Sequence, residues 1–201
     1  MILIPELETV VILTPRTGTR ALKNAVAARW PRSILLYRHM EADGVPRGYD
    51  RWRKIGVVRE PVARLFSLYK YLQRFGLDWC EEHDETYTAR QRESVAQPFE
   101  DWMMRNELPF TTPYDSAGRG RFFPAYSVNH PIPENRKSQF VYLRPDLGTE
   151  IVPYREIERL HRRLRIDPQH ANVSPRGEAP LLSAEAQAYV ARWFAWDSDN
   201  S

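Results

Sequence analysis

The sequence predicts an α/β protein with three layers, in which helices flank a central parallel sheet. Short runs rich in β-branched and aliphatic residues alternate with segments whose apolar residues recur at helical spacing. The predicted strands are residues 9–14 (TVVILT), 33–37 (SILLY) and 54–58 (KIGVV), and the predicted helices are residues 18–29 and 61–73. Strands that alternate with helices pair in parallel, and the helices then cover the faces of the sheet.

Both helices have apolar stripes and recognisable ends. Pro31 follows the first helix, whereas the second begins at Pro61 and stops near Gly76. Proline suits the first position of a helix because it has no N–H group to leave unpaired there. The stripes consist of Leu22, Ala25 and Val26 in the first helix and of Val62, Leu65, Phe66, Tyr69 and Leu72 in the second.

The remainder of the chain is less regular. Residues 95–106 are expected to be helical, and residues 107–136, rich in Pro, Gly and aromatic residues, are expected to form a long ordered loop. A strand is expected over residues 140–143 and a helix over residues 154–164. A last helix should start at Ser183, a residue type that caps helix N-termini. We expect residues 1–201 to form a single domain.

Composition narrows the class of protein. A formal net charge of +3 over 201 residues is too small to indicate nucleic acid binding by itself. Cys80 is the only cysteine, which excludes an intrachain disulfide and favours a reducing compartment. No apolar run approaches the ~20 residues needed to cross a bilayer, and no signal peptide is recognisable. The sequence therefore favours a cytoplasmic protein without a membrane partner, and its histidines show no metal-ligand spacing.

The first candidate site lies between the first strand and the first helix, in the segment VVILTPRTGTRAL. A tight turn before a helix points backbone amides at an anion, and the helix dipole favours negative charge there. Gly18 lets a ligand approach the backbone, Arg16 and Arg20 supply charge, and Thr17 and Thr19 supply hydroxyl groups. The segment lacks the lysine of the GxxxxGK[ST] motif, which disfavours an ordinary ATPase or GTPase.

The second candidate site follows the strand at residues 54–58, in KIGVVREPVARLFSLYKYL. Arg59 leaves the carboxyl end of this strand, where ligands bind in open α/β sheets. Ser67 lies about two helical turns beyond Pro61 and off the apolar stripe, so its hydroxyl can face a ligand. An amphipathic helix with an incidental arginine is the alternative interpretation of this segment.

Together these segments resemble the PAPS-dependent sulfotransferases. PRTGT is similar to their 5′-phosphosulfate-binding loop, P-[KR]-[ST]-G-[TS]-T, although Arg20 replaces the usual second threonine. The later segment is similar to their 3′-phosphate motif, strand-R-x-P-x-x-R-x-x-S-x-[YW]. The residues that match this motif are Arg59, Pro61, Arg64, Ser67 and Tyr69. The resemblance implies a P-loop-like domain that binds PAPS (3′-phosphoadenosine 5′-phosphosulfate) and leaves PAP as product.

The resemblance also suggests a role for a C-terminal segment. HANVSPRGE, residues 170–178, is similar to H-x-N-x-S-x-[RK] of carbohydrate sulfotransferases, where a loop closes over the nucleotide. It would make Ser174 and Arg176 further phosphate contacts; an exposed turn is the alternative. The resemblance covers residues 9–72 well, residues 140–195 loosely and residues 76–136 hardly at all.

Sulfuryl transfer needs a base for the acceptor hydroxyl. Cytosolic sulfotransferases carry a histidine after a short strand between the two nucleotide motifs, and His39 matches that place. Residues 16–40 contain no Asp or Glu, so a carboxylate base would have to come from Glu41 or Asp43. The resemblance implies that residues 16–20 hold the 5′-phosphosulfate and that Arg59 and Ser67 hold the 3′-phosphate. Arg16 would stabilise charge on the bridging oxygen without donating a proton.

The acceptor cannot be named from the sequence. Its binding site is expected mainly in the insertion at residues 76–136, whose aromatic residues offer stacking surfaces for a small molecule or carbohydrate, but which could equally form core. These residues are Trp79, Trp102, Phe110, Tyr114, Phe122, Phe123 and Tyr126. A small-molecule or nucleoside kinase on a P-loop fold is one alternative function. A non-catalytic module that binds anions or nucleic acid is another.

Overall fold

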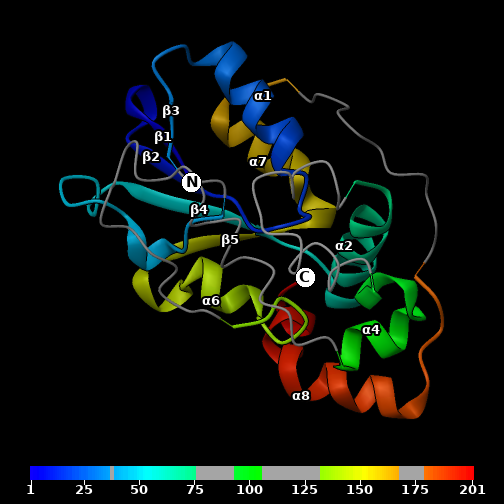
Figure 1. The fold of residues 1–201 in the computed structure, drawn as a ribbon. Helices are drawn as coiled ribbons and strands as arrows, with labels where there is room; N and C mark the ends of the chain where they lie inside the picture. Colours follow the sequence, from blue (N-terminus) through cyan, green and yellow to red (C-terminus); the bar gives the residue numbers. More distant parts are fainter. Residues whose placement is uncertain (37–38, 76–92, 106–131, 168–178) are drawn as a thin grey trace.

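A computed structural model gives the fold of the protein and describes residues 1–36, 39–75, 93–105, 132–167 and 179–201 (Figure 1). It is an α/β fold around an open five-stranded sheet with the strand order β3-β1-β2-β4-β5. The strands are β1 (Ile2–Ile4), β2 (Thr9–Ile12), β3 (Ile34–Leu35), β4 (Arg53–Val58) and β5 (Thr149–Pro153). The α/β class and three of the four predicted strands are confirmed.

The sheet is mixed, so the prediction of a parallel sheet is wrong for one half of it. β2, β4 and β5 are parallel, but β1 pairs antiparallel with both β2 and β3. The reason lies in the connection between β1 and β2, which consists of the 3-10 turn Pro5–Leu7 and of Glu8 in a left-handed conformation. A parallel crossover needs a dozen or more residues, so a link this short imposes an antiparallel pair.

Two strands were missed, and one predicted strand is a helix. β1 and β5 have no counterpart in the sequence prediction, and residues 140–143 lie in the short helix α6 (Gln139–Leu143). Ser138 caps this helix, because its side chain accepts a hydrogen bond from the amide of Phe140. A short apolar run such as FVYL fits a buried strand and a buried helix equally well, and here the cap decides between them.

The predicted helices are confirmed with small shifts at their ends. They are α1 (Thr19–Arg29), α2 (Pro61–Phe75), α4 (Phe99–Arg105), α7 (Ile157–Leu164) and α8 (Ala184–Asn200). α7 follows the 3-10 turn Tyr154–Glu156, and Ser183 caps α8 by accepting from the amide of Ala186. The helical stretch before α4 is interrupted at Gln97 and Pro98, because proline disfavours a helical conformation of the residue before it. No helix in the described ranges is both long and apolar enough to cross a membrane.

Helices cover both faces of the sheet (Figure 1). Val11 and Leu13 pack with α1 and α7 on one face, and their neighbours Val10 and Ile12 pack with Leu143 of α6 on the other. This alternation is the two-residue period of a strand that is buried on both sides. A third apolar cluster joins α2, α4 and α8.

The parallel half of the sheet positions the candidate site. The carboxyl ends of β2, β4 and β5 lie at one edge, because parallel strands run in the same direction. Residues 13–18 follow β2 at this edge, Arg59 follows β4 and Tyr154 follows β5. The fold therefore collects three segments that are far apart in the sequence at the place where open α/β sheets bind ligands.

Gly56 in β4 provides a test of the packing between the sheet and α6. A Cβ atom built on Gly56 overlaps the side chain of Leu143, which is fully buried. We expect Gly56→Ala to lower the free energy of unfolding by about 1–3 kcal/mol in urea denaturation, the usual cost of overpacking a core. Combining it with Leu143→Ala should cost less than the sum of the two single changes, because the smaller side chain makes room. Strict additivity would contradict this packing.

Candidate functional site

The loop between β2 and α1 has the backbone of an anion-binding turn. Arg16 and Gly18 both have left-handed conformations, with φ angles of 66° and 79°. Gly18 is the N-cap of α1 and has no side chain that could cap the first amides of the helix. These amides and the helix dipole favour a bound anion at this position.

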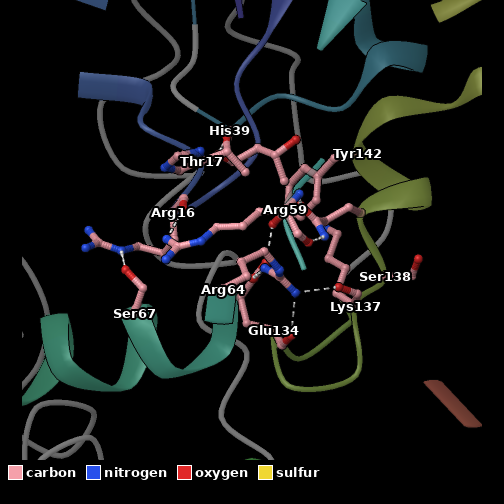
Figure 2. Close-up of polar contacts among 12 residues, drawn as sticks. Arg16, Thr17, His39, Arg59, Arg64, Ser67, Glu134, Lys137, Ser138 and Tyr142 are labelled. Carbon is pink, nitrogen blue, oxygen red and sulfur yellow. Dashed lines mark hydrogen bonds and ion pairs between the residues drawn. The ribbon is translucent and has the colours of Figure 1, made fainter. Parts of the chain in front are cut away.

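The Arg16 side chain connects this loop to α2. Its Nε donates a 3.2 Å hydrogen bond to Ser67 Oγ, and its guanidinium carbon lies 4.5 Å from the centre of the Tyr71 ring. Ser67 and Tyr71 share one face of α2, because residues four apart in a helix are neighbours. Figure 2 shows Arg16 reaching across to Ser67 on this helix. The two sequence motifs therefore meet directly.

Arg59 makes a second connection between the motifs. Its Nη1 donates a 3.0 Å hydrogen bond to the carbonyl oxygen of Arg16, 43 residues away. Its guanidinium carbon lies 5.2 Å from the centre of the Tyr154 ring. The edge of the same ring lies 3.5 Å from the position that a Cβ on Gly18 would occupy. Tyr154 thus lies against both the loop and Arg59.

The pKa values of both guanidinium groups lie below the ordinary value of arginine. Burial is the largest cause that lowers the pKa of Arg16; Arg59 and Arg20 lower it further, whereas Tyr71 acts in the opposite direction. Burial also lowers the pKa of Arg59, with a small contribution from Arg64, whereas Tyr154 and Glu60 act in the opposite direction. Arginine stays protonated at any physiological pH, so the site holds two desolvated cations that a phosphate or sulfate would stabilise.

The other predicted residues of the loop have unequal roles. The Thr17 hydroxyl is buried and donates a 2.9 Å hydrogen bond to the carbonyl of Thr14, so it shapes the turn. Thr19 is the first residue of α1, and its half-buried side chain lies at the amide end of the helix. Arg20 is exposed, and its charge acts on Arg16. Arg20 therefore adds positive potential at the mouth of the site.

His39 is tied to the same loop from the other side. Its Nδ1 lies 2.8 Å from the carbonyl oxygen of Leu13, and 9% of the residue is exposed. A carbonyl can only accept a hydrogen bond, so Nδ1 carries the proton and Nε2 of the neutral ring is the basic nitrogen. This contact ties His39 to a residue three positions before Arg16 in the same loop. The geometry suits a base that acts next to the anion site.

The two alternative carboxylate bases are engaged elsewhere. Glu41 is fully buried, and its Oε1 lies 2.7 Å from Nζ of Lys137, which is also fully buried. Asp43 forms a 3.2 Å ion pair with Arg144. Both carboxylates therefore pair with cations outside the loop after β2. His39 remains the better candidate.

Arg64 belongs to the core, although it occupies a motif position. It is fully buried and lies 2.6 Å from Glu134, whose carboxylate also accepts a hydrogen bond from Tyr142 (Figure 2). Burial lowers the pKa of Arg64, but the charges of Glu134 and Asp197 outweigh this effect and leave it above the ordinary value. The adjoining motif residue Tyr69 is also buried and donates to the carbonyl of Gln97.

The structure does not describe several of the predicted residues. Ser174 and Arg176 lie outside the described residues, as does most of the insertion at residues 76–136 and most of its aromatic side chains. Trp102 is described, and it is 1% exposed within the cluster of α2, α4 and α8. Of the two interpretations left open for Trp102, the core one is therefore confirmed.

The sequence interpretation missed three residues near the site. Tyr71 was detectable, because it lies one helical turn after Ser67. Tyr154 was predicted only as the start of a helix, because β5, which brings it to the site, was not predicted. Gln139 carried no signal at all, because its contact with Arg59 spans 80 positions in the sequence. Long-range polar contacts leave no periodic pattern in a sequence.

Comparison with known proteins adds no relative: no family model, curated protein or solved structure matches the chain. Within the described ranges, no group of three or more His, Cys, Asp or Glu side chains could hold a metal ion.

The buried pair of Arg64 and Glu134 should be essential for stability. Glu134→Gln leaves a buried guanidinium without its carboxylate, so we expect a loss of about 3–5 kcal/mol in the free energy of unfolding. The matched control is Arg105→Ala, which breaks an ion pair whose arginine side chain is 70% exposed. That change should cost less than about 1 kcal/mol. If both variants lose the same free energy of unfolding in urea denaturation, burial of the pair of Arg64 and Glu134 does not contribute to stability.

Proposed function

We propose that the protein is a sulfotransferase that moves a sulfuryl group from PAPS to a hydroxyl or amine of an acceptor. The proposal includes a three-layer, P-loop-like arrangement of the nucleotide-binding part. The observation that carries it is the meeting of the two motifs, in which Arg16 contacts Ser67 and Arg59 contacts the carbonyl of Arg16. Two sequence matches that could each have arisen by chance thus belong to one site.

The nucleotide would span the carboxyl edge of β2 and β4. Its 5′-phosphosulfate would lie on the amides of residues 16–20, and its 3′-phosphate would lie near Arg59 and Ser67. Arg16 already contacts Ser67, so this arginine would reach both groups. The charges favour such a ligand, because the site gathers cations whose pKa values are lowered by burial.

The reaction is an in-line displacement at sulfur. The acceptor oxygen or nitrogen forms a bond to sulfur as the bond between sulfur and the 5′-phosphate oxygen breaks, and PAP leaves with that electron pair. His39 would take the acceptor proton at Nε2, since Nδ1 is held by the Leu13 carbonyl. Arg16 would stabilise the charge that grows on the bridging oxygen. The acceptor would be a small molecule or carbohydrate.

Nucleotide binding is the first test. We expect PAP to bind with a Kd of about 10 μM or less by calorimetry, and 5′-AMP to bind at least about tenfold more weakly, because AMP lacks the 3′-phosphate. Equal or absent binding of both nucleotides would refute the sulfotransferase proposal. Binding of ATP that requires Mg²⁺ would then favour a kinase, and affinity for RNA with a steep salt dependence would favour a nucleic-acid-binding module.

Variants separate the binding groups from the base. Arg16→Ala and Arg59→Ala should abolish measurable sulfuryl transfer, whereas Arg16→Lys should retain part of it because a positive charge remains. His39→Ala should lower kcat by about 10²–10⁴-fold and leave the Kd for PAP within about twofold, because the base does not hold the nucleotide. Arg105→Ala, far along the chain on α4, is the control. A normal kcat for His39→Ala would remove His39 from the mechanism.

A further inference from the structure

The side chain of Gln139 forms two hydrogen bonds with the backbone of Arg59. The amide of Arg59 donates to Oε1 over 2.9 Å, and Nε2 donates to the carbonyl of Arg59 over 2.7 Å. Gln139 is fully buried at the start of α6. Its amide group imitates the donor and acceptor pair of a neighbouring strand, one residue beyond the end of β4.

Arg59 needs such a partner because it lies between two regular elements. The last pair of the ladder between β4 and β5 is Val58 with Pro153, and α2 begins at Pro61. The backbone of Arg59 therefore has no partner in the ladder or in the helix. A buried amide or carbonyl without a hydrogen bond is costly, so the contact with Gln139 holds the backbone in one conformation.

Asp197 fixes the orientation of Gln139. This fully buried carboxylate of α8 accepts from the backbone amide of Gln139 over 2.9 Å and from its Nε2 over 3.0 Å. It also accepts a hydrogen bond from the hydroxyl of Ser138. A carboxylate and a carbonyl can only accept, so the NH₂ group of Gln139 must face Asp197 and the Arg59 carbonyl. The flipped orientation of the amide is excluded.

We propose that Gln139, oriented by Asp197, is a positioning residue that sets the direction of the Arg59 guanidinium towards the anion site. The effect travels through the backbone of Arg59, which fixes where the side chain starts. This inference rests on the proposed function for the identity of the anion, the 3′-phosphate of PAPS. It extends the site to α8, more than a hundred residues along the chain.

The first experiment compares Gln139→Leu with Ser138→Ala. Both changes remove a hydrogen bond to Asp197, but only the first removes the contact with Arg59. We expect Gln139→Leu to accelerate hydrogen exchange of the Arg59 amide by at least about tenfold in NMR of the ligand-free protein. It should also weaken the binding of PAP by about tenfold or more and the binding of AMP by less than about twofold. Ser138→Ala should leave the exchange rate of the Arg59 amide and the affinities for PAP and AMP unchanged.

A second variant keeps the shape of the side chain. In Gln139→Glu, an ionised carboxylate would face Asp197 and could not donate to it, whereas a protonated carboxyl group could. Burial and the charge of Asp197 favour the protonated form, and the buried guanidinium of Arg64, which interacts with Asp197, acts in the opposite direction. The preference for PAP over AMP, relative to wild type at the same pH, should therefore recover as the pH is lowered from about 8 to about 6. Gln139→Leu has no group that titrates and should show no recovery.

The outcomes separate this inference from the proposed function. Unchanged exchange of the Arg59 amide in Gln139→Leu would overturn the inference, whatever the ligand of the protein is. If wild type prefers PAP and Arg59→Ala loses that preference, an unaltered preference in Gln139→Leu would overturn the inference alone. If wild type binds no PAP, the proposed function fails, and the amide exchange still decides whether Gln139 holds Arg59. A Gln139→Leu variant that fails to fold leaves Gln139→Glu at low pH to decide.

Discussion

Burial of charge in one short segment, residues 134–139, organises the whole site. Glu134 holds Arg64 of α2, Lys137 holds Glu41, and Gln139 holds the backbone of Arg59. Glu134, Arg64, Lys137, Glu41 and Gln139 are each at most 1% exposed, so each would be strongly destabilising without its partner. The pairs therefore admit one arrangement of the segments around them. That arrangement brings the end of β4 and the start of α2 to fixed positions relative to the loop after β2.

The sequence revealed the local part of this design but not the long-range part. The strand at residues 54–58 and the helix after Pro61 follow from apolar periodicity and from proline at a helix start. The antiparallel β1 was missed because three residues are too short to show alternation. The ion pair of Lys137 with Glu41 spans 96 positions, and no local pattern encodes it. Such contacts become visible only when the chain is folded.

The candidate site was partly predictable for the same reason. Arg16 and Ser67 were each marked by a motif, but their direct contact depends on how α2 packs, which the sequence does not state. α2 divides its polar residues between two environments. Ser67 and Tyr71 face the loop and Arg16, while Arg64 faces the buried carboxylate of Glu134. Arg64 and Tyr71 are nearly two helical turns apart and therefore lie on the same side of α2. A small rotation of α2 about its axis would change both contacts together.

The proposed base and the proposed anion-binding groups share one support, which limits how they can move relative to each other. The Leu13 carbonyl holds His39, the Thr14 carbonyl holds Thr17, and the Arg16 carbonyl holds Arg59. These three carbonyls lie within four residues of one loop, so a shift of the loop carries the base and both arginines with it. A displacement reaction requires nucleophile, sulfur and leaving oxygen in line, and small errors in that alignment are costly. In the proposed reaction, attachment of the proton acceptor and the cations to one turn would satisfy this requirement better than independent elements would. The backbone of the loop, rather than any single side chain, would then determine whether the site can perform that reaction.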